Sequence, residues 1–391
     1  MQRKTHRRVS RTHQENGFSL VEVMVGMLIG LIGIIVIFQV LQLSESRKRT
    51  TTSGSDAQIA GTVAMFALER DLRLGGFGFG AAVTATGGGL MGCNATVYDG
   101  QNPAVNFPLR VTPVQITDGA AGAPDSITVL WGSSLTFSNF ETFTNWTDTS
   151  KLLKFRNGID RGDLVLVGGT LAGGALGCHV LEVSDTSNAD QRTINHVAGG
   201  YLSKDGVTPL ISRYNNPAGP GMAFTTAGGF VYDLGPYPRA NKWSIRNGKL
   251  TLEDLIHYLD ANGDAQNDWI EIADGVIDLQ AQYGSASALG LIADNAWSAA
   301  TPANPAAWSA VRAIRVAILT RSGEYEKDYT AANPVWGCSF GVACANFVLT
   351  NLDGSAGTAA PADPVNDWHH YRYRVYETVI PFRNVIWGAA P

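Results

Sequence analysis

Near its N-terminus the chain reads Gly17-Phe18-Ser19-Leu20-Val21-Glu22, and an apolar run then continues to Leu43. From Val23 to Phe38 this run contains no polar residue other than glycine. It is about as long as a helix needs to cross the hydrocarbon core of a bilayer. The run is too long for a cleavable secretory signal, and no small-x-small cleavage site follows it. We therefore predict a membrane-spanning helix, with the basic leader in the cytoplasm and the rest of the chain on the far side.

Glu22 is the residue of this run that lipid disfavours. A carboxylate in the apolar zone costs about 2.5 kcal/mol or more unless something neutralises it. If the chain is cut between Gly17 and Phe18, Phe18 gains a free ammonium group, and Glu22 lies four residues further along the same helical face. The ammonium of a neighbouring subunit would serve equally well. The alternative is a helix-end glutamate that reaches back to the membrane interface.

The basic residues, the sequence from Gly17 to Glu22 and the apolar helix together resemble the prepilin signal of type IV pilins. The resemblance implies that a prepilin peptidase cuts after Gly17 and that the new N-terminal residue, Phe18, is methylated. It also implies that Glu22 pairs with the N-terminus of a neighbouring subunit during assembly. Within the same helix, Gly26 and Gly30 form a GxxxG pair, which either lets membrane helices approach closely or is simply tolerated there.

We expect the helix to continue beyond the membrane as an amphipathic stretch. Ser53-Gly54 is a weak point for a kink or a melted turn, and Asp56 can cap the stretch that follows. Gly75-Gly76 ends it. The apolar residues Ile59, Val63 and Phe66 recur at helical spacing, and Met65, Leu68 and Leu72 broaden this stripe, which we expect to pack on the head. The predicted parts are a leader peptide over 1–17, a transmembrane and assembly helix over 18–43, its amphipathic continuation over 44–75 and an exported β-rich head over 76–391.

After residue 75 the pattern favours strands. Short β-branched or apolar runs predict strands at 126–131, 163–167, 276–283, 313–320 and 371–387. Asn247-Gly248, between two such runs, predicts a hairpin with a two-residue turn. We find no further pattern of a long helix, which excludes repeated βαβ units. The predicted fold class is α+β and pilin-like, with a long N-terminal helix packed on a large antiparallel β-sheet head.

Four segments resemble the PilW family of minor pilins. They are Asp71–Phe77, Asp274–Gly284, Val311–Leu319 and Val375–Asn384. Ordinary core strands would show similar patterns, so these matches are less specific than the leader. The resemblance implies a minor pilin that takes part in initiating pilus assembly and sits at the pilus tip.

Charge and cysteine content limit the function further. The formal net charge is −5, but residues 1–17 carry +4, which leaves −9 for the rest of the chain. A net-acidic body argues against a general affinity for nucleic acid, which requires basic residues to displace counterions. The four cysteines are even in number and none has metal-ligand spacing. In an exported protein disulfides are expected. Of the three possible pairings we favour Cys338–Cys344 and Cys93–Cys178, with free buried thiols as the alternative.

One segment resembles a calcium loop. Residues 260–271 place oxygen-bearing side chains at positions 1, 3, 5, 9 and 12 of that pattern. These side chains are Asp260, Asn262, Asp264, Asp268 and Glu271. Ala265 stands where the calcium loop requires glycine, and an acidic, solvated hairpin loop is the alternative. No catalytic constellation is evident. His369 and His370 would point to opposite faces at a strand start, so they are not expected to chelate a metal together.

The sequence therefore predicts a non-enzymatic assembly subunit with no cofactor other than possible calcium. By resemblance its partners would be other minor pilins, the major pilin, the prepilin peptidase and the inner-membrane assembly platform. It would span the bacterial inner membrane once, with a cytoplasmic N-terminus and a periplasmic head, before entering the pilus. The alternatives are a J-type minor pseudopilin of a type II secretion system, which gene neighbours would distinguish, and a tip adhesin or DNA-uptake subunit, which ligand binding would distinguish.

Overall fold

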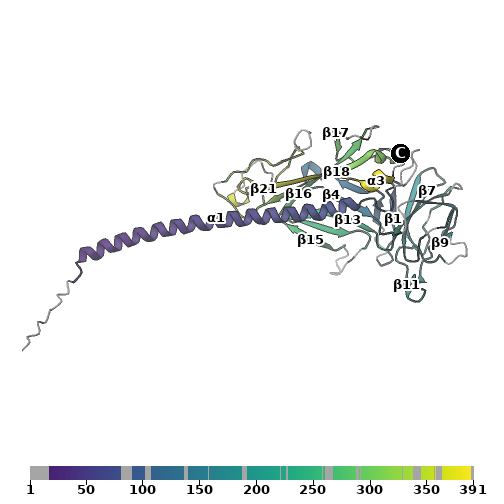
Figure 1. Ribbon diagram of the computed structural model, residues 1–391, viewed down its shortest axis with the longest axis horizontal. Coiled ribbons are helices and arrows are strands. Elements are labelled where there is room, and N and C mark those ends of the chain that lie inside the picture. Colours follow the sequence, from purple (N-terminus) through teal and green to yellow (C-terminus); the bar gives the residue numbers. More distant parts are fainter. Residues whose placement is uncertain are drawn as a thin grey trace, which may run out of the picture. The chain divides into compact units, whose positions relative to one another are not determined.

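The computed structural model describes residues 17–80, 90–101, 107–135, 140–156, 158–186, 192–220, 222–225, 228–257, 259, 267–287, 290, 292–327, 329–337, 345–355, 357 and 363–388. It divides into two compact units, Met1–Ser53 and Gly54–Pro391. The first helix, α1 (Leu20–Leu74), contributes residues to both units (Figure 1).

Helix α1 runs without interruption from Leu20 to Leu74, which corrects one expectation. Residues Ser53 and Gly54 are helical, so no turn melts there, and Asp56 lies inside the helix instead of capping a new one. The end is as expected. Gly76 adopts a left-handed backbone with φ of +82°, which favours glycine at the end of a helix. The side-chain amide of Asn384 donates to the carbonyl oxygens of Leu74 and Gly75, which fixes this end against the C-terminal segment.

The second unit contains three larger sheets rather than one (Figure 1). The eight-stranded sheet has the order β2 (Phe107–Arg110), β1 (Asn94–Val97), β8 (Leu176–Glu182), β7 (Leu164–Thr170), β12 (Gly229–Gly235), β5 (Glu141–Trp146), β6 (Ser150–Leu153), β9 (Thr193–Asn195). The five-stranded sheet has the order β15 (Trp269–Asp274), β14 (Lys249–Asp254), β13 (Arg239–Arg246), β4 (Ser126–Trp131), β3 (Val114–Thr117). The four-stranded sheet has the order β17 (Ile292–Ser298), β16 (Val276–Ala286), β18 (Val311–Arg321), β21 (Tyr373–Pro381).

Smaller elements complete the described part of this unit. Two further sheets have two strands each: β10 (Gly200–Leu202) with β11 (Pro209–Ile211), and β19 (Val335–Trp336) with β20 (Ala345–Asn346). The helices after α1 are short: α2 (Pro305–Ala310), α3 (Arg383–Gly388) and the 3-10 turns η1 (Ala120–Gly122), η3 (Pro364–Asn366) and η4 (Trp368–His370). The prediction that no long helix follows residue 75 is therefore confirmed for the described residues.

Strand pairing is antiparallel apart from β1 and β8, which run parallel and pair at Thr96 and His179. The predicted hairpin is confirmed, because β13 and β14 pair in register across Asn247 and Gly248. Both turn residues have positive φ, 52° and 73°, as a type I′ turn requires. The predicted strand over 371–387 is shorter than expected. It spans only Tyr373–Pro381, and α3 follows it.

The face of α1 that packs on the head agrees only in part with the predicted stripe. Ala64, Leu68 and Leu72 are fully buried and join the main core cluster with residues of all three larger sheets, so the prediction is confirmed for Leu68 and Leu72. It is wrong for the other side of the stripe, where Ile59 is 60% exposed and Phe66 is 68% exposed. The helix thus meets the head with a face of small and apolar residues at helical spacing.

Gly61 explains why this face contains small residues. A Cβ atom at this position would lie 2.1 Å from a ring carbon of Tyr376 in β21, far closer than two carbons can approach. The Tyr376 hydroxyl donates to the carbonyl of Gln58, one turn earlier in the helix, at 3.1 Å. A helix-interior glycine costs about 1 kcal/mol relative to alanine. Here it allows the ring to lie directly against the helix backbone.

Asp71 is a buried carboxylate that ties α1 to the five-stranded sheet. It accepts hydrogen bonds from the indole N–H groups of Trp131 in β4, at 2.8 Å, and Trp243 in β13, at 2.7 Å. The side-chain amide of Asn241 donates to both of its oxygens at 3.1 Å. Burial raises the pKa of Asp71, and these donors partly offset that effect. The carboxylate therefore fixes both the position and the rotation of the last helical turn.

Candidate functional site

At the start of α1, the side chain of Glu22 is hydrogen-bonded to the backbone of the uncleaved chain. Its carboxylate accepts a hydrogen bond from the backbone N–H of Ser19 at 3.0 Å. The sequence Ser19-Leu20-Val21-Glu22 has capping-box spacing, in which the fourth residue reaches back to an amide that the helix leaves unpaired. The sequence analysis missed this signal. The Glu22 carboxylate is bonded to Ser19, the residue directly after Phe18. Cleavage after Gly17 would convert the backbone nitrogen of Phe18 to an amine.

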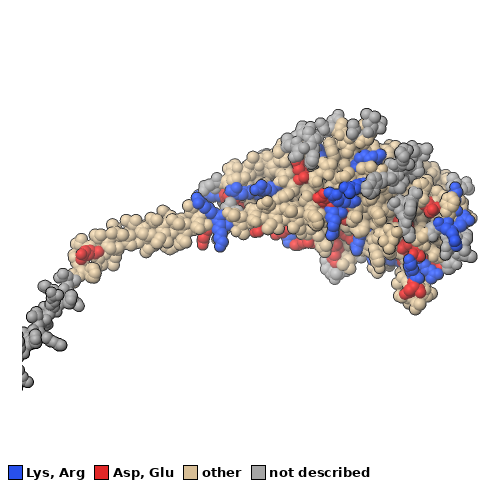
Figure 2. All heavy atoms as spheres, viewed as in Figure 1, with Lys and Arg blue, Asp and Glu red and all other residues tan. Residues whose placement is uncertain are grey.

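The helix that follows has the length and composition of a membrane span. Leu20–Glu45 has a mean hydropathy of 2.8, and none of it is buried within the structure. No charged residue lies between Glu22 and Glu45, and Figure 2 shows a long stretch of the helix without blue or red atoms. Gly26 and Gly30 have no atom of another segment within 4 Å of where a side chain would begin, so the GxxxG face is open. An apolar helix of this kind, with one acidic residue in its first turn, is suited to membrane anchoring.

A second exposed apolar surface lies on α1 within the second unit. Ile59, Val63 and Phe66 are spaced by four and three residues, so they form one stripe on the outward side of the helix. Their exposed fractions are 60%, 47% and 68%. Charged residues border the stripe further along, where Glu69 and Arg73 form an ion pair. Apolar side chains aligned in this way on a helix form a surface for packing against another helix.

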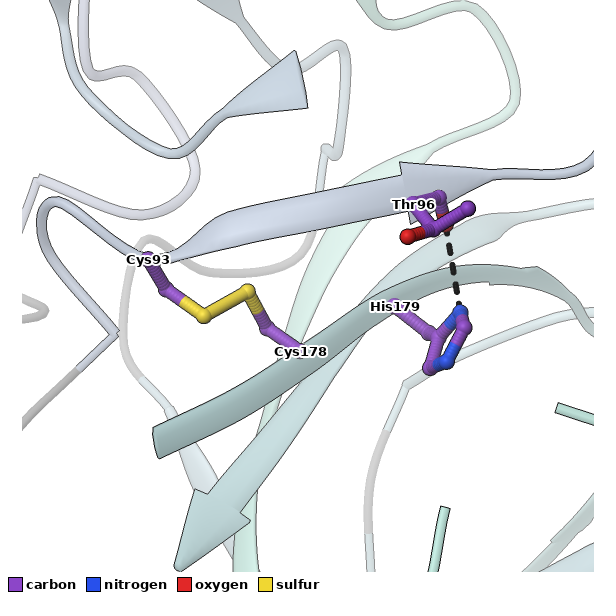
Figure 3. Close-up of a disulfide and its surroundings, with 4 residues drawn as sticks. All are labelled: Cys93, Thr96, Cys178 and His179. Atoms are coloured by element: carbon purple, nitrogen blue, oxygen red, sulfur yellow. Dashed lines mark hydrogen bonds between the residues drawn. A yellow bond between two sulfur atoms is a disulfide. The ribbon is translucent and has the colours of Figure 1, made fainter. Parts of the chain in front are cut away.

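The structure confirms the disulfide between Cys93 and Cys178, whose Cα atoms are 6.4 Å apart (Figure 3). The disulfide connects Cys93, the residue before β1, with Cys178 in β8. Strands β1 and β8 form the parallel pair. In the same region the Nδ1–H of His179 donates to the carbonyl of Thr96 at 3.1 Å (Figure 3). Burial lowers the pKa of His179, which keeps its ring neutral in this role. Cys338 and Cys344 lie outside the described residues, and their pairing stays a prediction.

The proposed calcium loop falls largely on residues that the structure does not describe, namely Asp260, Asn262 and Asp264. Of the other two, Asp268 donates its backbone N–H to the carbonyl of Leu259, and the Glu271 carboxylate forms an ion pair with Lys249 at 2.7 Å. Within the described ranges no three His, Cys, Asp or Glu side chains are grouped so that they could hold a metal ion. Calcium binding stays a prediction, which calorimetric titration of the full chain would test.

The two adjacent histidines are held in a 3-10 turn, η4, and not at a strand start as expected. The His369 ring contacts the carboxylate of Asp367 at 2.6 Å, which also accepts the His369 backbone N–H. The His370 ring donates to the carbonyl of Glu326 at 3.1 Å. Each ring thus has a separate hydrogen-bond partner.

Two family models match the chain. Residues 244–384 match the model of type IV pilus-assembly protein W, and residues 12–38 match the prokaryotic N-terminal methylation motif. The first segment runs from within β13 to the residue after the start of α3 and contains the whole four-stranded sheet. The second contains Gly17, Phe18 and Glu22. No curated protein and no solved structure matches the chain.

Proposed function

We propose that this chain, whose two matches are those of a PilW-family pilin with a prepilin-type signal, helps to initiate type IV pilus assembly and sits at the pilus tip. The matches support the broader assignment to a type IV pilus-related minor pilin with a membrane anchor. The position of Glu22 carries the mechanistic part of the proposal. Its carboxylate lies beside the backbone nitrogens at the start of an apolar helix, where an ammonium group would neutralise it.

In the proposed mechanism a prepilin peptidase cuts between Gly17 and Phe18, and the new amine of Phe18 is methylated. Methylation keeps the positive charge. The carboxylate of Glu22 then pairs with the Phe18 amine of its own chain or of a neighbouring pilin. Because an unpaired carboxylate in lipid costs about 2.5 kcal/mol or more, pairing with the amine of a neighbouring pilin favours side-by-side helices in one register.

The outward stripe of Ile59, Val63 and Phe66 supports a second contact above the membrane. Once neighbouring helices are in register, this stripe offers an apolar surface for another pilin subunit. The head, residues 76–391, is bulky for a unit that repeats along a thin fibre, which favours a minor subunit placed at the end. The expected partners are other minor pilins, the major pilin and the membrane assembly platform.

Mass analysis of the native protein, with and without the prepilin peptidase, tests the first step. We expect a mature chain that begins at methylated Phe18 when the peptidase is present and at Met1 when it is absent. Glu22→Gln tests the second step, with Glu45→Gln, at the other end of the apolar segment, as the matched control. Glu22→Gln should be cleaved normally but should strongly reduce pilus number, whereas Glu45→Gln should leave it unchanged. Normal pili in the Glu22→Gln strain would refute the charge-pairing mechanism.

A further inference from the structure

A cavity of about 610 Å³ opens beside the eight-stranded sheet. Its wall includes three carboxylates from the same end of three neighbouring strands. Asp163 precedes β7, Glu182 ends β8 and Asp233 lies near the end of β12. The strand register sets Leu164, the residue after Asp163, opposite both Glu182 and Gly235. The three carboxylates therefore converge. The eight-stranded sheet lies outside residues 244–384, so the pilus-assembly family model does not cover these carboxylates.

All three carboxylates are buried, and two of them, Asp163 and Glu182, have no ion pair among the described residues. Asp163 is 9% exposed, and one of its oxygens accepts the backbone N–H of Asp160 at 2.8 Å. Glu182 is 7% exposed and accepts hydrogen bonds from the hydroxyl of Tyr201 at 2.6 Å and from the backbone N–H groups of Arg213 and Tyr214. Neutral donors stabilise these charges less than a cation would.

The cationic side chains in the same wall form ion pairs with other carboxylates. Arg213 forms a two-pronged pair with Asp99 at 2.7 and 2.8 Å. Arg161 pairs with Asp185 at 3.0 Å, and Lys204 pairs with Asp160. Burial, together with the charges of Asp233 and Asp160, raises the pKa of Asp163 to about 7. The part of this rise that comes from the neighbouring carboxylates reflects negative potential, which a bound cation would relieve.

The size and the walls of the cavity indicate which kind of cation fits. Among the described residues no group of His, Cys, Asp or Glu side chains is close enough to hold a metal ion. The volume is that of a site for an organic molecule. The rings of Tyr201 and Tyr237 and the side chains of Leu135 and Leu210 line it. Tyr237 is 68% exposed, so its ring is accessible at the rim. Aromatic rings beside carboxylates are a recurrent environment for bound ammonium groups.

We propose that this cavity binds an organic cation, an ammonium or guanidinium group on an apolar stem. The charge faces Asp163 and Glu182, and the stem lies against Tyr237 and Leu210. Two sources carry this chemistry: a lysine or arginine side chain of another protein, and a free polyamine. The site goes beyond the proposed assembly function and does not depend on it, because no residue of α1 lines the cavity.

Isothermal titration of the mature full-length chain in mild detergent tests the proposal. The probes are cadaverine, Nα-acetyl-lysine methylamide and, as the neutral analogue, 1,5-pentanediol. We expect saturable 1:1 binding of the two amines and none of the diol. Asp163→Asn should weaken amine binding at least tenfold, because it removes the charge but keeps an oxygen for the N–H of Asp160. Glu324→Gln, which removes an exposed charge that does not line the cavity, is the matched control and should bind as the wild type does.

Tyr237→Ser is a second variant, and it should fold normally because the side chain of Tyr237 is largely exposed. It should weaken amine binding about threefold to tenfold through loss of the aromatic contact. Tighter binding of the lysine derivative supports a protein side chain as the ligand, and tighter binding of cadaverine supports a polyamine. Equal amine binding by the wild type and Asp163→Asn would overturn the proposal. Binding of a neutral disaccharide, unchanged in Asp163→Asn, would also overturn it and indicate a sugar site.

Discussion

Replacement of Asp71 by alanine tests how α1 is held on the head. The change removes the acceptors of three buried donors, the indole N–H groups of Trp131 and Trp243 and the amide of Asn241. A buried donor without an acceptor costs about 1–3 kcal/mol. The variant also relieves the burial of a carboxylate, whose pKa is raised for that reason. We therefore expect a loss of about 3–5 kcal/mol in the free energy of unfolding, which is near the lower end of the summed cost of the three unpaired donors.

Asp71→Asn should be milder, at about 1–3 kcal/mol, because one oxygen remains while the new amide group faces an indole donor. Urea unfolding of the mature chain in mild detergent, followed by tryptophan fluorescence, measures both losses. Trp131 and Trp243 are themselves reporters of the contact. Asp56→Ala, an exposed carboxylate on the same helix, is the control and should change stability by less than about 0.5 kcal/mol. If Asp71→Ala is as stable as this control, the carboxylate does not anchor the helix.

Three further predictions concern the same unit. Cys93→Ser opens a covalent loop with a sequence separation of 85 to Cys178, and urea unfolding should show a loss of about 4–5 kcal/mol. Gly61→Ala should cost about 1–3 kcal/mol by overlap with the ring of Tyr376, and Tyr376→Leu in the same chain should recover at least half of it. Burial raises the pKa of Asp163 from an ordinary value of 3.8 to about 7 in the folded chain, so its stabilisation is complete below about pH 4 and is lost as the pH rises through 7. Relative to Asp163→Asn, the wild type should therefore lose about 1.4 kcal/mol between pH 6 and pH 8 in urea titrations, and a pH-independent difference would contradict this.

The sequence was sufficient for elements whose signal is local. The membrane helix follows from a long uninterrupted apolar run, and the hairpin at Asn247-Gly248 follows from a turn that requires two positive φ angles. The strand over Val311–Arg321 was also predictable, because both of its faces are buried and seven of its eleven residues are therefore apolar. In each case the residues that form the element also carry the pattern that reveals it.

The face of α1 that packs on the head was predictable only in part. Apolar character grouped Ile59, Val63 and Phe66 with Leu68 and Leu72, but only the latter two are buried. The buried face is chosen by approach distance, because the ring of Tyr376 lies against the helix backbone. The contact depends on a residue more than 300 positions away, and no local pattern reports it.

The candidate sites differ in the same way, since one is formed by a local motif and the other by distant segments. The proposed cleavage and pairing residues Gly17, Phe18 and Glu22 lie within one six-residue segment, and a short motif identifies them. The cavity carboxylates Asp163, Glu182 and Asp233 are spread over 70 residues and come together only because β8, β7 and β12 are neighbours in the sheet. Strand order of this kind is set by pairing between distant segments, and an apolar–polar pattern does not encode it.

The eight-stranded sheet is built into the head and is not a separate appendage. Its residues Leu164, Leu166 and Val180 belong to the same core cluster as Leu68 and Leu72 of α1. Next to the cavity, the N–H of Ser133 donates to the carbonyl of Leu234, and the N–H of Gly132 donates to the carbonyl of Phe77, three residues after the helix ends. The wall of the cavity is thus linked to the end of α1 through two backbone hydrogen bonds and a shared core. Force on a ligand held at Asp163 would reach the helix through these contacts and not through a flexible linker.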